Sequence, residues 1–487
     1  MPASTRTTFF ERLRALLWDP RKTPWLAIAI IAVASLPTLR FMWHRAGNVR
    51  GWEADAIAKA IVNGHGFSFA GHERWLWEKW KGDPNAYFPT AWVDPVFTYL
   101  LAGAHWVFGH YVYIAMYGVA SLCMGIMYYC SYRTAARFGG PWLGALAVTL
   151  IAANIGLGRA FFDDITNSAL AAAAISATAL ACVKYFEQPD RRRLIIMGFA
   201  IGFTVLSCPA VVYFPLFMVG ALAFLHAPKL NIAFRHSAIM LLCTAAVLAP
   251  WTIRNYLTFD EFVLVRNGAG QIAWDGTVGP AATFMRGKDV DKSPVPPPWH
   301  SSGPEEAVEG MLTKEKRLPV HRYQVISLTA APVPGYHEMN EAERDELSMS
   351  RAMEFIVKHP VVAAKLGLIK LWVYFTRFGI YGLLILAGAV VTALARWRDK
   401  RTWPLTLLAL SYSLPFVLVI AYFGRYRAPI EPVLSMLAAI GIGSLVTSRW
   451  GVRMRESLEA RFALPESGMA VFSNGGDNKR ANRPFGR

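Results

Sequence analysis

The sequence contains little cysteine, and its two long polar segments contain none. Five cysteines occur among 487 residues, and none lies in residues 44–92 or 254–360. Disulfide bonds therefore cannot hold these polar segments together. The cysteine spacing also fits neither a zinc site nor a redox pair, so we expect core or lipid-facing residues. All five lie in apolar stretches, at Cys123, Cys130, Cys182, Cys208 and Cys243.

Acidic residues are also scarce. The sequence has 33 Asp and Glu residues and 50 Lys and Arg residues, which gives a net charge of +17. However, hydrophobic residues make up 54% of the chain and the mean hydropathy is +0.31, values that indicate a membrane protein. In such proteins Lys and Arg collect in cytoplasmic loops. We therefore interpret the basic charge as an orientation signal and expect no nucleic-acid partner.

Apolar stretches long enough to cross a lipid bilayer recur along the chain, which predicts an all-α polytopic membrane protein. A spanning helix needs about 20 mainly apolar residues, since its backbone groups find no partners in lipid. About ten spans are expected, at residues 24–43, 111–130, 141–158, 165–185, 194–211, 212–227, 237–253, 378–395, 403–423 and 428–447.

The basic residues set the expected orientation of these spans. Short loops rich in arginine or lysine, such as residues 191–193 and 396–401, should be cytoplasmic. Both termini then lie inside, and the polar segments face the periplasmic or extracellular side of a plasma (inner) membrane. The expected regions are a basic leader at 1–23, a transmembrane core at 24–253 with a first outer loop at 44–92, an outer segment at 254–360, an interfacial helix with C-terminal spans at 361–447, and a basic tail at 448–487.

Nucleotide-binding motifs are missing as well. The sequence has no Walker A motif and no dinucleotide fingerprint, and its inner loops are too short for a nucleotide-binding domain. Any activated donor should therefore come from the membrane or the outer side. Ionisable residues are also scarce within the apolar stretches, whereas transporters usually place such groups at mid-membrane.

A predicted helix beginning at Trp52 carries two acidic residues on different faces. Glu53 shares a stripe with Ile57 and Ile61, the face expected to pack inward. Asp55 lines up with Lys59 four residues later, a pair typical of a solvated face. A sheltered carboxylate with a raised pKa can accept protons near neutral pH, so Glu53 is the candidate base. The alternative is an ordinary interfacial carboxylate.

Asp163 and Asp164 stand where a span is expected to re-enter the membrane from outside. A single carboxylate there could simply cap the helix and interact with its dipole. Two adjacent acids could also bind a divalent cation, the candidate cofactor, or orient a substrate hydroxyl. The sequence leaves both interpretations open.

Arginines at outer span ends run against the positive-inside trend. Arg254 follows one span, and Arg425 and Arg427 share a tight turn before another. Arginine binds phosphate bidentately and stays charged, so these residues are candidates for binding a lipid phosphate. Snorkelling to ordinary headgroups is the alternative.

Several short motifs, spread over residues 50 to 435 in a fixed order, resemble the GT-C glycosyltransferases, specifically the bacterial members related to protein O-mannosyltransferases and lipid A aminoarabinose transferases (glycosyltransferase family 39-like). The motifs are Trp52-Glu53 with Gly64-His65-Gly66-Phe67-Ser68, Pro89-Thr90-Ala91-Trp92 with Pro95, Pro250-Trp251-Thr252-Ile253-Arg254-Asn255 with Asn267-Gly268, Arg344-Asp345 with His359-Pro360, and Arg425-Tyr426-Arg427 with Pro429 and Glu431.

The resemblance implies a GT-C fold and an inverting transfer of a sugar from a polyprenyl-phosphate donor to an envelope acceptor. It also implies an acidic base at the position of Glu53, a second acidic position at Asp163 or Asp164, and a metal in some members only. The rival hypotheses are a flippase for lipid-linked saccharides and a non-enzymatic partner in envelope polysaccharide assembly. A flippase would need a polar path through the membrane. A non-enzymatic assembly partner would not depend on the candidate carboxylates.

Overall fold

The computed structural model of the chain describes residues 25, 27–29, 31–32, 53–70, 86–162, 165–277, 339–376, 379–417 and 426–447. The chain divides into two units, residues 1–441 and 442–487, and the packing discussed below lies within the first. The described elements are α3 Glu53–Val62, β1 Ser68–Ala70, β2 Tyr87–Pro89, α5 Pro95–Phe108, η1 Gly109–Tyr111, α6 Val112–Gly139, α7 Pro141–Ala153, α8 Ile155–Phe162, α9 Ser168–Glu187, α10 Arg191–Ser207, η2 Pro209–Val211, α11 Phe214–His226, α12 Leu230–Phe259, α13 Ala269–Thr277, α16 Glu341–Lys358, α17 Pro360–Thr376, α18 Gly379–Ala395, η5 Lys400–Thr402, α19 Trp403–Ser413, η6 Leu414–Val417, η8 Ala428–Ile430 and α20 Glu431–Thr447.

The described helices confirm a polytopic membrane protein. Among the described residues, five stretches are long and apolar enough to cross a membrane, or up to seven if each of two bent helix pairs forms one span. The five are Pro95–Gly139, Ser168–Glu187, Pro209–His226, Leu230–Phe259 and Ala428–Val446. The expected span at 24–43 and the end of the one at 403–423 fall largely outside the described residues. The helix at the expected span 194–211 is α10, which has 17 residues.

Small residues let the central helices approach closely. An added Cβ at Gly198 or Gly202 of α10 would stand 2.8 to 2.9 Å from the carbonyl oxygens of Met240 and Thr244 in α12. The Thr244 hydroxyl donates a 3.1 Å hydrogen bond to the Gly198 carbonyl. Such contacts are typical of helix pairs in membranes, where burying apolar surface gives no advantage over lipid.

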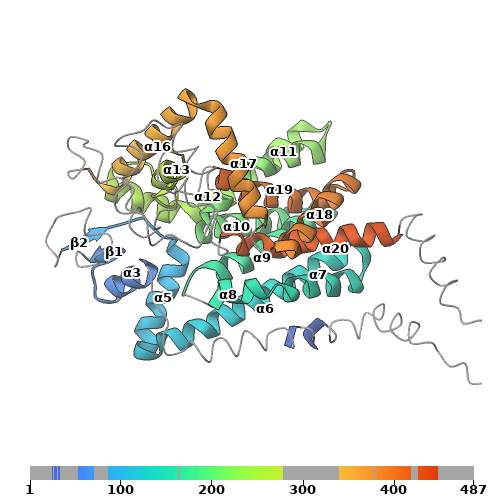
Figure 1. The fold of residues 1–487 in the computed structure, drawn as a ribbon, viewed down its shortest axis with the longest axis horizontal. Coiled ribbons are helices and arrows are strands. Elements are labelled where there is room, and N and C mark those ends of the chain that lie inside the picture. The colour runs from blue at the N-terminus through green and yellow to red at the C-terminus, as the bar shows by residue number, and fades with distance from the viewer. Residues whose placement is uncertain are drawn as a thin grey trace, which may run out of the picture. The chain divides into compact units, whose positions relative to one another are not determined.

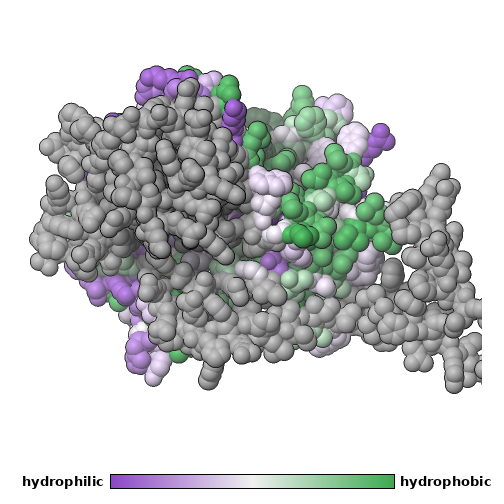
Figure 2. Space-filling model, viewed as in Figure 1, coloured by the Kyte–Doolittle hydropathy of each residue, from purple (hydrophilic) through white to green (hydrophobic). Residues whose placement is uncertain are grey.

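The surface of α18 is apolar, as a lipid-facing helix requires. Ile380, Leu384 and Leu394 are each at least 65% exposed. Figure 2 shows apolar residues gathered over the region of α18 and α19, whereas hydrophilic residues collect where α16 meets α17. This distribution fits a bundle surrounded by lipid with a polar end.

The polar end is built from α3, the two-stranded sheet, α13 and α16, together with α5. Figure 1 shows α5 turning across the end of α6, with η1 at the corner. Strands β1 and β2 pair antiparallel, with Phe69 opposite Phe88. Helix α12 continues to Phe259, six residues beyond the span end expected at residue 253, and so carries Arg254 into this polar end.

Candidate functional site

The buried carboxylate of α3 is Asp55, contrary to the expectation that it faces solvent. Asp55 is 3% exposed. Its Oδ1 lies 2.7 Å from His105 Nε2 in α5, and its Oδ2 accepts hydrogen bonds from Tyr113 at 3.0 Å and from Lys59 at 2.7 Å. Burial raises the pKa of Asp55, but the bonds from His105 and Lys59 outweigh it and hold the pKa below its ordinary value.

Glu53, the candidate base, is only partly buried. Its stripe partner Ile57 is fully buried, so the predicted inward face of α3 does exist. The spacing of residues along α3 did not predict the burial of Asp55, because the groups that enclose this side chain come from α5 and α6. The catalytic role of Glu53 stays a prediction.

Arg254 holds the base of the β1–β2 hairpin. Its Nη1 donates to the carbonyl of Thr90 at 2.8 Å and its Nη2 to the carbonyl of Phe67 at 2.9 Å. The guanidinium also lies over the rings of Phe67 and Trp251, at 5.5 and 5.0 Å. These contacts give Arg254 a structural role in this conformation, and the phosphate contact predicted for it stays a prediction.

Glu341, which the sequence analysis did not single out, joins the two outer segments. Its Oε2 accepts a 2.5 Å hydrogen bond from the Thr90 hydroxyl. Its Oε1 accepts from the Ala91 amide and from Asn267 Nδ2, both at 2.9 Å. Burial raises the pKa of Glu341 by more than these three hydrogen bonds lower it. The only local signal was the capping box of Asn340 and Glu343 around it, which predicts a helix start and no long-range contact.

Asp345, one turn further along α16, fixes α13 against it. Its Oδ1 accepts a 2.9 Å hydrogen bond from the Gln271 amide in the first turn of α13. A carboxylate is favoured there because the first amides of a helix lack partners. An added Cβ at Gly270 would stand 1.9 Å from the Asp345 carbonyl, so this contact requires glycine. The motifs at residues 89–92, 254–255, 267–268 and 344–345 therefore converge at one place.

Arg427 is fully buried, although the sequence predicted an arginine at the membrane surface. Its Nε donates to Glu431 Oε2 at 2.8 Å, and its Nη2 donates to the carbonyl of Gly382 at 3.1 Å. Its Nη1 donates to the carbonyls of Tyr374 and Phe375, near the end of α17. The phosphate contact predicted for Arg427 stays a prediction. In the described structure the residue joins α17, α18 and α20, which a local sequence pattern cannot reveal.

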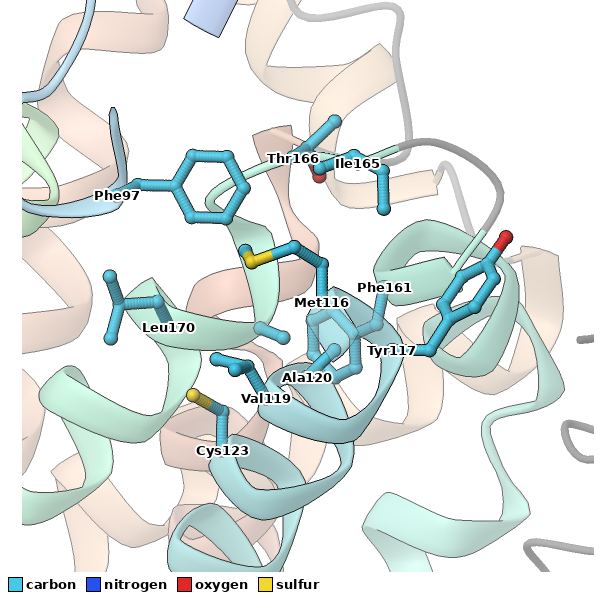
Figure 3. A pocket seen from close by; sticks show the side chains of 11 residues that line it. Phe97, Met116, Tyr117, Val119, Ala120, Cys123, Phe161, Ile165, Thr166 and Leu170 are labelled. Carbon is cyan, nitrogen blue, oxygen red and sulfur yellow. The ribbon is translucent and has the colours of Figure 1, made fainter. Parts of the chain in front are cut away.

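An apolar groove opens between α5, α6, α8 and α9. Phe97, Met116, Tyr117, Phe161 and Leu170 are among the side chains around it, as Figure 3 shows. Ile165 and Thr166 complete the rim next to positions 163 and 164 of the chain. Asp163 and Asp164 themselves lie outside the described residues, as does Arg425.

The described residues include no group of three His, Cys, Asp or Glu side chains that could hold a metal ion. The predicted cation ligands Asp163 and Asp164 are not among the residues searched. The metal therefore stays a prediction tied to that pair.

Part of the chain matches a known protein family. Residues 90–253 match the sequence profile described as dolichyl-phosphate-mannose-protein mannosyltransferase. The match covers about a third of the chain and agrees with the resemblance carried by the short motifs. No curated protein sequence matches the chain.

Solved structures of two other proteins are similar to the chain. One is the archaeal oligosaccharyltransferase AglB from Archaeoglobus fulgidus in complex with an inhibitory peptide and a dolichol-phosphate, at 13% identity and a TM-score of 0.47, covering 91% of this chain and 52% of that one. The other is ArnT from Cupriavidus metallidurans bound to undecaprenyl phosphate, at 13% identity and a TM-score of 0.31, covering 91% and 82%. The chain thus spans about half the length of the archaeal protein.

Proposed function

We propose that the chain is a glycosyltransferase that takes a sugar from a polyprenyl-phosphate donor on the non-cytoplasmic face of the membrane and transfers it, with inversion, to an envelope acceptor. The observation that carries the proposal is the convergence of the family-like motifs around Glu341, at the polar end of an apolar bundle. In the proposed reaction an outer-face carboxylate accepts the proton of the acceptor hydroxyl, and the departing lipid phosphate takes the electron pair of the broken bond.

The proposed orientation follows from the distribution of basic residues. Arg137 and Arg401 lie together at the end of the bundle that carries the basic loops, since the Arg401 guanidinium donates to the Arg137 carbonyl at 3.1 Å. Both arginines also pair with Glu187. By the positive-inside trend this end is cytoplasmic. The assembly around Glu341 then faces the outer side.

The test uses the purified full chain in lipid nanodiscs and a panel of synthetic undecaprenyl-phosphate hexoses and pentoses. An extract of envelope glycans and lipids serves as the acceptor. We expect one donor to release free undecaprenyl phosphate in an acceptor-dependent manner, measured by mass spectrometry. A protein that moves these lipids between leaflets of liposomes without releasing undecaprenyl phosphate would be a flippase, and the proposal would be wrong.

The predicted cation can be tested in the same assay. If Asp163 and Asp164 hold a divalent ion, EDTA should stop the release of undecaprenyl phosphate and Mn²⁺ or Mg²⁺ should restore it. Asp163→Asn and Asp164→Asn should each raise the cation concentration required. If EDTA leaves the rate unchanged and either substitution destabilises the protein, the two aspartates cap a helix and bind no cation.

A further inference from the structure

Another carboxyl group lies where the first outer segment meets the membrane core. Asp94 immediately precedes α5 and is 6% exposed. Asn167, the residue before α9, donates from Nδ2 to Asp94 Oδ2. The other oxygen, Oδ1, is buried and has no hydrogen-bond partner among the described residues. Leaving a buried acceptor unpaired costs free energy, so a purely structural role does not explain this oxygen.

The groups that face Asp94 come from several elements. Arg266, in the loop after α12, attracts its charge, and Cys208 at the end of α10 and Tyr412 of α19 are the titratable neighbours. Burial is the largest influence and raises the pKa of Asp94 to about 6, against the opposing effects of Arg266 and Asn167. The carboxyl group therefore changes its protonation within the range in which a general base works efficiently.

Two other carboxylates of the polar end, Asp55 and Glu341, have both oxygens occupied. Asp55 bonds to His105 through Oδ1 and to Tyr113 through Oδ2. Both oxygens of Glu341 accept hydrogen bonds as well. Among these three, Asp94 is the one that keeps an oxygen available for a further hydrogen bond.

Asp94 and the contact between Asp55 and His105 lie toward opposite ends of α5. The contact between Asp55 and His105 puts the start of α3 against the far half of α5, whereas Asp94 stands at the beginning of α5. Ten residues of helix separate Pro95 from His105, which corresponds to about 15 Å. Asp94 and Asp55 therefore cannot share one proton directly.

We propose that Asp94 Oδ1 accepts the proton of the acceptor hydroxyl during sugar transfer. This inference rests on the proposed function. The acceptor O–H bond breaks and its proton goes to Oδ1, while the acceptor oxygen forms a bond to the anomeric carbon. The bond from that carbon to the phosphate oxygen breaks, and the lipid phosphate leaves with the electron pair. Asn167 holds Oδ2, which fixes the direction of Oδ1.

The experiment compares Asp94→Asn and Glu53→Gln in the undecaprenyl phosphate release assay. The control is Asp260→Asn, which changes an exposed acid at the end of α12. We expect Asp94→Asn to lower kcat about 10²- to 10⁴-fold, the usual contribution of a general base. It should also abolish the fall in rate below about pH 6. Wild-type kcat and an unchanged pH profile in folded Asp94→Asn would overturn the inference, whereas absence of release by the wild-type protein would instead overturn the proposed function.

A second variant, Asn167→Ala, tests the same inference while the carboxyl group of Asp94 is kept. The hydrogen bond from Asn167 lowers the pKa of Asp94. In Asn167→Ala the midpoint of the acidic limb of the pH–rate profile should therefore move to higher pH, an effect that a structural role of Asp94 does not produce. If Asp94→Asn does not fold, an unmoved midpoint in Asn167→Ala overturns the inference by itself.

Discussion

The Thr90 hydroxyl donates a 2.5 Å hydrogen bond to Glu341 and so joins positions 251 residues apart in the chain. The neighbouring amide of Ala91 donates to the same carboxylate. Since Thr90 lies near the end of the first outer segment and Glu341 begins α16, this carboxylate fixes the two outer segments to each other.

Glu341→Ala should destabilise the folded protein by about 2–4 kcal/mol, because three hydrogen bonds worth about 1 kcal/mol each lose their acceptor. Glu341→Gln should cost much less, since the amide oxygen can still accept from Ala91 and Asn267. Thermal unfolding in nanodiscs measures both. The control is Glu354→Gln in the exposed pair with Lys358, which should leave the midpoint unchanged. Equal effects of Ala and Gln at position 341 would contradict the hydrogen-bonding role.

Arg254→Lys should loosen the base of the hairpin, because one ammonium group cannot reproduce the fork that reaches both the Phe67 and Thr90 carbonyls. The Thr90 amide bonds to the Phe67 carbonyl at 3.1 Å, so its hydrogen exchange should accelerate. Binding of undecaprenyl phosphate, measured by native mass spectrometry, should change little. A large loss of binding with unchanged exchange would restore the predicted phosphate role.

Removing one member of the buried Arg427–Glu431 pair should destabilise the protein by about 3–5 kcal/mol, because the other charge remains buried without its partner. Arg427→Met and Glu431→Leu combined should cost less than the sum of the single changes. Unfolding midpoints of the four proteins form the double-mutant cycle. Additive effects would show that the two side chains do not act as a pair.

Asp55→Asn should lower stability at pH 7, where the carboxylate is ionised and bonded to His105, Tyr113 and Lys59. The folded-state pKa of Asp55 lies below the ordinary value of 3.8, so its contribution is present above that value and is lost as the pH falls through the folded-state pKa. Unfolding midpoints recorded from pH 7 to pH 3 should therefore converge for the two proteins at the acid end. A gap that stays constant over this range would exclude an ionic contribution.

The sequence by itself predicted the membrane environment, an outer position for the polar segments and the GT-C resemblance, because span length, basic loops and ordered short motifs are local properties. It also predicted a helix with Ile57 on its inward face, which the structure confirms. Residues 90–253 match the mannosyltransferase profile, in agreement with that resemblance.

Tertiary structure alone decided which polar groups are buried and with what partners. Asp55 is enclosed by His105 and Tyr113 from other helices, and Arg427 donates hydrogen bonds to carbonyl groups of α17 and α18. Glu341 and Asp94 gain their significance from Thr90 and Asn167, residues far away in the chain. Periodicity along one helix identifies a face, but the pKa and the hydrogen bonds of a side chain depend on what packs against that face.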